Sequence, residues 1–134
     1  MRLPALSPWI FRLWVVLILF SQTALAGRLA DAFMGLFLEP GPAVDSWMRF
    51  VTQKAYHVLL FGGMGALLAL RSKPAGRWEI FAWCVGFSAF AESLQAFSPN
   101  RHPSPWDALL NITAALAFYQ LSARASGRGS RPGS

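Results

Sequence analysis

Charged side chains and cysteine are both scarce in this chain. Of its 134 residues, 13% are charged and 54% are hydrophobic, and the mean hydropathy is +0.39. This balance excludes an ordinary water-soluble domain and favours an integral membrane protein. Cys84 is the single cysteine, which excludes an intrachain disulfide and a cysteine-rich zinc site. We expect Cys84 to be a small core residue, and we expect neither a metal ion nor a cofactor.

The net charge of +6 is the one property shared with nucleic-acid-binding proteins. The basic residues, however, stand beside apolar runs, as they do in the cytoplasmic loops of membrane proteins. We therefore expect no nucleic-acid partner. The partner that the composition indicates is membrane lipid.

Four apolar runs divide the chain. The first, residues 9–26, is about long enough to cross a bilayer of roughly 30 Å. It also has the basic start, apolar centre and small-residue end of a secretory signal peptide, so a retained helix and a cleaved signal are both open. In either case Gly27 lies outside the cytoplasm. The later runs are residues 55–70, 78–97 and 106–123.

The segments between these runs predict the topology. Residues 27–54 mix both charges with Pro and Gly, which favours an extracytoplasmic connection with a short surface helix near 28–37. Residues 124–134 are basic and rich in Gly and Ser, which predicts a disordered cytoplasmic tail. By the positive-inside rule, both ends of the uncleaved chain face the cytoplasm. The residues that mark this side are Arg71, Lys73, Arg77, Arg124, Arg128 and Arg131.

Together these features predict an all-α, polytopic integral membrane bundle. We expect four transmembrane helices, or three if the first run is cleaved, in the bacterial inner membrane, with residues 55–123 as the transmembrane core. Small residues four apart let helices in such a bundle approach closely. The pairs expected to do so are Gly62 with Ala66, Gly65 with Ala69, and Ala82 with Gly86.

Polar residues gather near the outer ends of the last three runs. They are spaced three or four apart within each run, so the members of each pair share a helix face. An ionisable side chain that faces lipid at mid-helix costs about 2.5 to 3.5 kcal/mol. We therefore expect these faces to converge inside the bundle. The predicted binding residues are Lys54, His57, Glu92, Gln95, Arg101, Asp107 and Asn111.

The same residues carry a resemblance to a known family. The segments "KAYH" at 54–57, "ESLQAFSPNR" at 92–101 and "DALLN" at 107–111 resemble the pattern of the VanZ-like family of small bacterial membrane proteins. That pattern is Lys-x2-His, followed by Glu-x2-Gln-x-Phe-x-Pro-x-Arg-x5-Asp-x3-Asn. The resemblance covers residues 54 to about 118 and implies a multi-spanning protein of the cell envelope. The family is named for a protein linked to resistance to the glycopeptide teicoplanin.

Two positions depart from the family pattern. Ala91 stands where the family often has an acidic residue before the Glu, which removes a possible acid and weakens the transfer of a catalytic pair to this chain. Ala114 stands where the family often has Gly, which loosens the packing of the last helix.

Three functions compete for the seven polar residues. In the first, they line an outward-facing pocket for a lipid headgroup or a lipid-linked envelope molecule, in which Arg101 and Lys54 hold a phosphate or carboxylate. Alternatively, they satisfy one another as an interhelical network that binds nothing. A membrane enzyme is less favoured, because no recognised nucleophile or metal-ligand spacing accompanies them. A transport path is disfavoured too, since the inner halves of the second and fourth runs carry no ionisable group.

Overall fold

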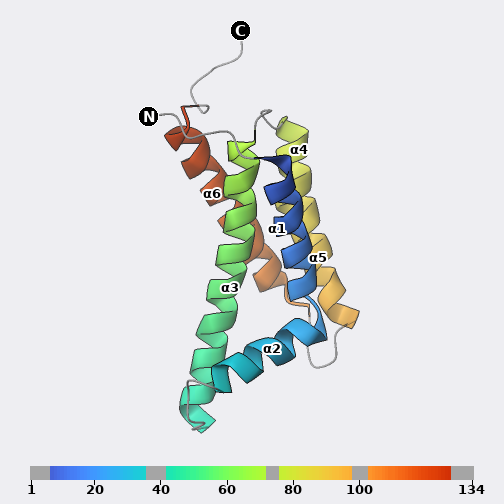
Figure 1. Ribbon diagram of the computed structural model, residues 1–134, viewed down its shortest axis with the longest axis vertical. Coiled ribbons are helices and arrows are strands. Elements are labelled where there is room, and N and C mark those ends of the chain that lie inside the picture. The colour runs from blue at the N-terminus through green and yellow to red at the C-terminus, as the bar shows by residue number, and fades with distance from the viewer. Residues whose placement is uncertain (1–6, 36–41, 72–75, 98–102, 128–134) are drawn as a thin grey trace.

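The computed structural model describes residues 7–35, 42–71, 76–97 and 103–127, and almost all of them are helical (Figure 1). The helices from α4 to η2 follow one another without a break and form one rod, in which η1 is a π-helical segment and η2 a 3-10 turn. The all-α class is therefore confirmed. The elements are α1 (Pro8–Ser21), α2 (Ala24–Gly35), α3 (Pro42–Leu70), α4 (Arg77–Phe81), η1 (Ala82–Phe87), α5 (Ser88–Leu94), η2 (Gln95–Phe97) and α6 (Pro105–Ala125).

Helices α1, α3 and α6 and the α4–η2 rod run alongside one another, and α2 crosses at one end (Figure 1). The start of α1, the end of α3, the start of α4 and the end of α6 lie together at the opposite end. Arg71, Arg77 and Arg124 therefore share that end, where Arg71 forms an ion pair with Glu79. We call it the basic end and the other the outer end. The remaining predicted markers, Lys73, Arg128 and Arg131, lie outside the described residues.

The first apolar run does not form one helix as predicted. Helix α1 stops at Ser21, and Gln22 and Thr23 turn the chain into α2. The hydroxyl of Thr23 accepts a hydrogen bond from the backbone N–H of Ala26 at 3.3 Å, which satisfies one of the free donors at the start of α2. The helix expected near 28–37 is thus α2, and it begins earlier than its charged residues indicated.

Two other predicted boundaries are wrong. Helix α3 is 29 residues long and begins at Pro42, so the second half of the expected connection at 27–54 is helical. Proline suits the first turn of a helix because the N–H that it lacks would have no partner there. Helix α6 continues to Ala125, and Gly127 follows it in a left-handed conformation with φ at 68°. The rest of the expected tail lies outside the described residues.

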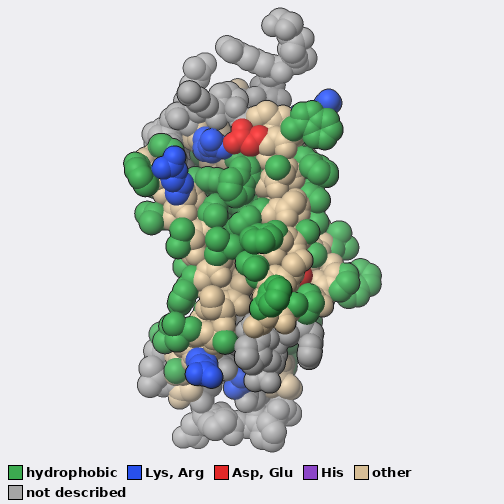
Figure 2. Space-filling view, turned by 90° about the vertical axis from the view of Figure 1, so that its right-hand side faces the viewer, with side chains coloured by type: hydrophobic (Ala, Val, Ile, Leu, Met, Phe, Trp, Pro, Cys, Tyr) green, Lys and Arg blue, Asp and Glu red, His purple; other side chains and the backbone are tan. Residues whose placement is uncertain are grey.

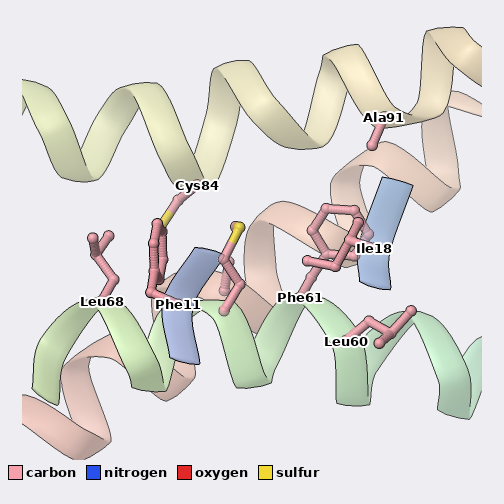
Figure 3. Close-up of a cluster of buried hydrophobic side chains, with 9 residues drawn as sticks. Phe11, Ile18, Leu60, Phe61, Leu68, Cys84 and Ala91 are labelled. Atoms are coloured by element: carbon pink, nitrogen blue, oxygen red, sulfur yellow. The ribbon is translucent and has the colours of Figure 1, made fainter. Parts of the chain in front are cut away.

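The apolar core lies between α3, α1 and the α4–η2 rod (Figure 3). Helix α1 contributes Phe11 and Ile18, and Ile18 is fully buried. Cys84 is also fully buried, as expected of a small core residue. On α3 the buried apolar residues are Leu60, Phe61, Met64, Leu68 and Ala69.

Glycines let α3 approach its two neighbours closely. A Cβ on Gly65 would lie 2.0 Å from the carbonyl oxygen of Ala115 on α6, and one on Gly63 would lie 2.4 Å from the ring of Trp14 on α1. The expected role of Gly65 is therefore confirmed. Gly86 is different, because it is exposed and a Cβ there would meet nothing within 4 Å. The expected packing of Ala82 with Gly86 inside the bundle is wrong.

The outward surface of the bundle is largely apolar. Figure 2 shows hydrophobic side chains over the middle of one face and Lys and Arg side chains towards its two ends. Trp78 and Trp106 are exposed, at 76% and 77%, and lie near opposite ends of the bundle. Tryptophan at both margins of an apolar band is typical of a protein embedded in a bilayer.

Among the described residues, one helical stretch is long and apolar enough to cross a membrane. It is Arg77–Phe97, with 21 residues and a mean hydropathy of 1.3. Only 28% of its apolar window is buried, so it differs from the core helix of a water-soluble protein. Helix α1 is apolar but shorter. Helices α3 and α6 are long enough, but polar residues that face each other across their contact lower their mean hydropathy.

Candidate functional site

Two polar pairs join α3 to α6 in the half of the bundle nearer the outer end. The ammonium of Lys54 forms an ion pair with the carboxylate of Asp107. One turn further along both helices, Nδ1 of His57 lies 2.8 Å from Oδ1 of Asn111. Both pairs form because Lys54 and His57 are three apart on α3, while Asp107 and Asn111 are four apart on α6. The close approach at Gly65 holds the two helices near enough for these contacts.

A second group of hydrogen bonds joins the α4–η2 rod to α1 and α6. The carboxylate of Glu92 accepts the backbone N–H of Ser104 at 2.9 Å and lies within 3.5 Å of the amide nitrogen of Gln95. That nitrogen also donates to Oε1 of Gln22 at 2.7 Å. In turn, Gln22 donates to the hydroxyl of Ser21 at 2.8 Å. Four helical elements therefore meet in polar contacts.

Ser104 connects the two groups. It precedes Pro105 at the start of α6, and its hydroxyl accepts the N–H of Asp107 at 3.4 Å. An acidic residue in the first turn of a helix also interacts favourably with the helix dipole. We call the connected set the polar layer. Its members are Ser21, Gln22, Lys54, His57, Glu92, Gln95, Ser104, Asp107 and Asn111.

The polar layer is buried except at Lys54 and Ser104, which are partly exposed. Asn111 is 0% exposed and Gln95 is 1% exposed. The side chain of Lys54 is 31% exposed, against 7% for that of its partner Asp107. Lys54 therefore connects the buried layer with the surface of the protein.

The structure brings together six of the seven predicted site residues, and the seventh, Arg101, lies outside the described residues. Three members of the layer were not predicted, namely Ser21, Gln22 and Ser104. Gln22 lies in the first apolar run, which also resembles a signal peptide. The feature that could have identified it is its amide side chain within an otherwise apolar stretch. Ser104 contributes through its backbone N–H and its position before Pro105, and a capping serine is recognisable only once the start of the helix is known.

One buried donor in the polar layer has no acceptor. Among the described residues, Nδ2 of Asn111 is the buried side-chain nitrogen or oxygen that makes no hydrogen bond. Its Oδ1 faces His57, so Nδ1 of His57 carries the proton in this arrangement. A buried donor without a partner costs about 1 to 3 kcal/mol. The protein therefore holds an amide ready for an acceptor that the described chain does not supply.

Two hydroxyl groups near the layer bond within their own helices. The hydroxyls of Ser88 and Thr113 each donate to a carbonyl one turn back in their own helix, at 2.7 and 2.8 Å, which is their usual role in apolar helices. No group of three or more His, Cys, Asp or Glu residues that could hold a metal ion is found in the described part of the chain.

Comparison with known protein families gives a match over most of the chain. A family model described as VanZ/LLP1 matches residues 9–125. The match begins in α1 and ends at the last residue of α6, so it includes every element that contributes to the polar layer. No curated protein and no solved structure matches the chain.

Proposed function

Because the chain belongs to the VanZ/LLP1 family, we propose that it is a multi-pass protein of the bacterial inner membrane whose polar layer recognises an envelope molecule. The molecule is a lipid headgroup or a lipid-linked or glycopeptide-related compound that approaches from the outer end. The observation that carries this proposal is the unpartnered amide of Asn111 within a buried layer that Lys54 opens to the surface. Buried polar groups are normally satisfied, and intramembrane ionisable groups generally mark functional sites.

Four spans are part of this proposal: α1, α3, the α4–η2 rod and α6. Helices α3 and α6 qualify despite their polar residues, because those residues face each other and leave apolar side chains outward. Leu59 and Leu109 are 66% and 52% exposed, respectively. With its 14 residues α1 is about 21 Å long. Bilayer thinning and long basic side chains accommodate such a short helix.

We propose that α1 is retained and is not a cleaved signal. In α1, the indole N–H of Trp14 donates to the carbonyl oxygen of Leu60 at 2.8 Å, and Ile18 is part of the apolar core. The family match also begins within α1. Removal of residues 1–26 would also leave Gln95 without Gln22. Intact mass spectrometry of protein extracted from membranes is expected to give the 14.7 kDa of the whole chain. A chain that begins at Gly27 would contradict retention.

Recognition by the polar layer predicts a ligand that remains bound during purification. Native mass spectrometry of the full chain from detergent-solubilised membranes is expected to show an adduct of constant mass. Arg101→Ala removes a predicted ligand contact, so it should reduce the adduct at least tenfold while the protein remains in the membrane. Arg124→Ala is the matched control, because this exposed arginine lies at the basic end. Wild-type protein without an adduct would contradict recognition.

A purely structural role is the second candidate, and the internal hydrogen bonds of the layer favour it. Lys54 with Asp107, and His57 with Asn111, satisfy each other across the helix contact. Bonds of this kind contribute about 0.6 kcal/mol each in a membrane protein. If this role is the whole function, Glu92→Gln and Arg101→Ala lower the amount of protein in the membrane, whereas an adduct is absent throughout. A membrane enzyme would in addition have to release a product.

A further inference from the structure

Two side chains at the contact between α3 and α6 have hydrogen-bond donors to spare. Asn111 holds an amide nitrogen with two N–H groups and no partner. The ammonium of Lys54 has three N–H groups, and its hydrogen bond in the described structure goes to Asp107. We propose that the ligand of the polar layer presents a phosphoryl group to these two side chains. This inference rests on the proposed function and specifies the chemistry of its ligand.

The two donors are spaced for one phosphoryl group. Asn111 is four residues beyond Asp107 on α6, so its amide lies one helical turn, about 5.4 Å, from the level at which Lys54 binds. Two hydrogen bonds of about 2.9 Å each, to different oxygens of one phosphoryl group, cover that separation. Because Lys54 has donors to spare, it can keep its contact with Asp107 while it binds the ligand.

The carboxylates of the layer bond to donors other than the amide of Asn111. Glu92 accepts the N–H of Ser104 and lies beside the amide nitrogen of Gln95, while Asp107 accepts from Lys54. His57 uses Nδ1 on the oxygen of Asn111. The buried amide of Asn111 is therefore left without an acceptor, and the group that it needs is an oxygen.

The position of the layer also favours a phosphoryl group. Lys54 is partly exposed, and it lies in the outer half of α3, at the same end of the bundle as the exposed Trp106 at the start of α6. Exposed tryptophans of membrane proteins lie at the level of the lipid headgroups. A headgroup phosphate is at that level in the bilayer, and a free phosphate can reach it from the aqueous side.

Calorimetric titration of the full chain in a phosphate-free maltoside detergent tests the proposal. The probes are dihexanoylphosphatidylglycerol, inorganic phosphate and, as the matched compound without phosphate, dihexanoylglycerol. We expect wild-type protein to bind the phosphatidylglycerol at least tenfold more tightly than the diacylglycerol. Binding of inorganic phosphate as well would indicate that the phosphoryl group suffices, and binding of the lipid alone would identify a headgroup as the source. Either result supports the proposal.

Asn111→Asp is the variant that removes the amide N–H donor of Asn111 and keeps the shape of its side chain. It retains an oxygen for His57 and replaces the N–H groups by a second acceptor, so binding of the phosphate-bearing probe should weaken at least tenfold. Thr113→Val is the matched control on the same helix, because Thr113 is exposed and bonds only within α6. Circular dichroism and gel filtration check that both variants fold. If Asn111→Asp does not fold, the comparison of the probes on wild-type protein decides.

Equal binding of the phosphatidylglycerol and the diacylglycerol would overturn the proposal, as would a folded Asn111→Asp variant that binds like the wild type. Failure of all three probes would overturn it as well. If a purified adduct still depends on Arg101 in that case, recognition by the layer stands and only its phosphoryl chemistry is wrong. If no adduct is found either, the proposed function fails together with this inference.

Discussion

The Gly65→Ala variant is expected to lose at least about 3 kcal/mol of folding stability, the upper end of the usual cost of overpacking. The added Cβ would lie 2.0 Å from the carbonyl oxygen of Ala115. That atom belongs to the backbone of α6, so no side-chain rotation relieves the overlap and the two helices must separate. Separation also lengthens the contacts of His57 and Lys54 with α6, which lie on the same helix faces.

Gly86→Ala is the matched control for this prediction. A Cβ at Gly86 meets nothing within 4 Å, and alanine is the better helix former by up to about 1 kcal/mol. Unfolding of both variants in the same detergent, followed by circular dichroism, gives the comparison. Equal stability of the two variants would show that α3 and α6 are not packed as described.

Lys54→Met is the second change with a large expected effect. It removes the charge that balances Asp107, whose side chain is 7% exposed. An unpaired carboxylate within the apolar part of a membrane protein costs about 2.5 to 3.5 kcal/mol. We therefore expect a loss of stability of that size in detergent and a smaller amount of protein in the membrane. Arg124→Met removes an exposed cation at the basic end and should change stability by less than about 1 kcal/mol. A Lys54→Met variant as stable as this control would contradict the prediction.

The convergence of the polar residues was predictable from the sequence for a physical reason. Hydrocarbon penalises lone charges, and a helix places residues three and four apart on one face. Lys54, His57, Asp107 and Asn111 obey both rules, so the convergence of their helix faces was predictable, whereas the pairs that they form are known from the structure. The donor left over on Asn111 was not predictable, since it depends on which of its atoms faces His57.

The helix boundaries were harder to predict, because apolar runs do not coincide with helices in this chain. Helix α3 extends to Pro42 through residues whose mixed charges favoured a loop. The run at 9–26 breaks at Gln22 and Thr23, and the same Gln22 completes the polar layer by accepting from Gln95. A single amide in an apolar run does not by itself predict a polar contact. That Gln95 is the partner of Gln22 is known only from the fold.

The central claim is that α3 and α6 bring their charged residues together because the surrounding hydrocarbon tolerates them only as partners. The coupling free energy between Lys54 and Asp107, measured with Lys54→Met, Asp107→Leu and the double variant, tests it most directly. We predict a coupling of at least about 1.5 kcal/mol, because an apolar pair replaces an ion pair without leaving a charge unpaired. Effects that add to within about 0.5 kcal/mol would mean that the two side chains do not meet.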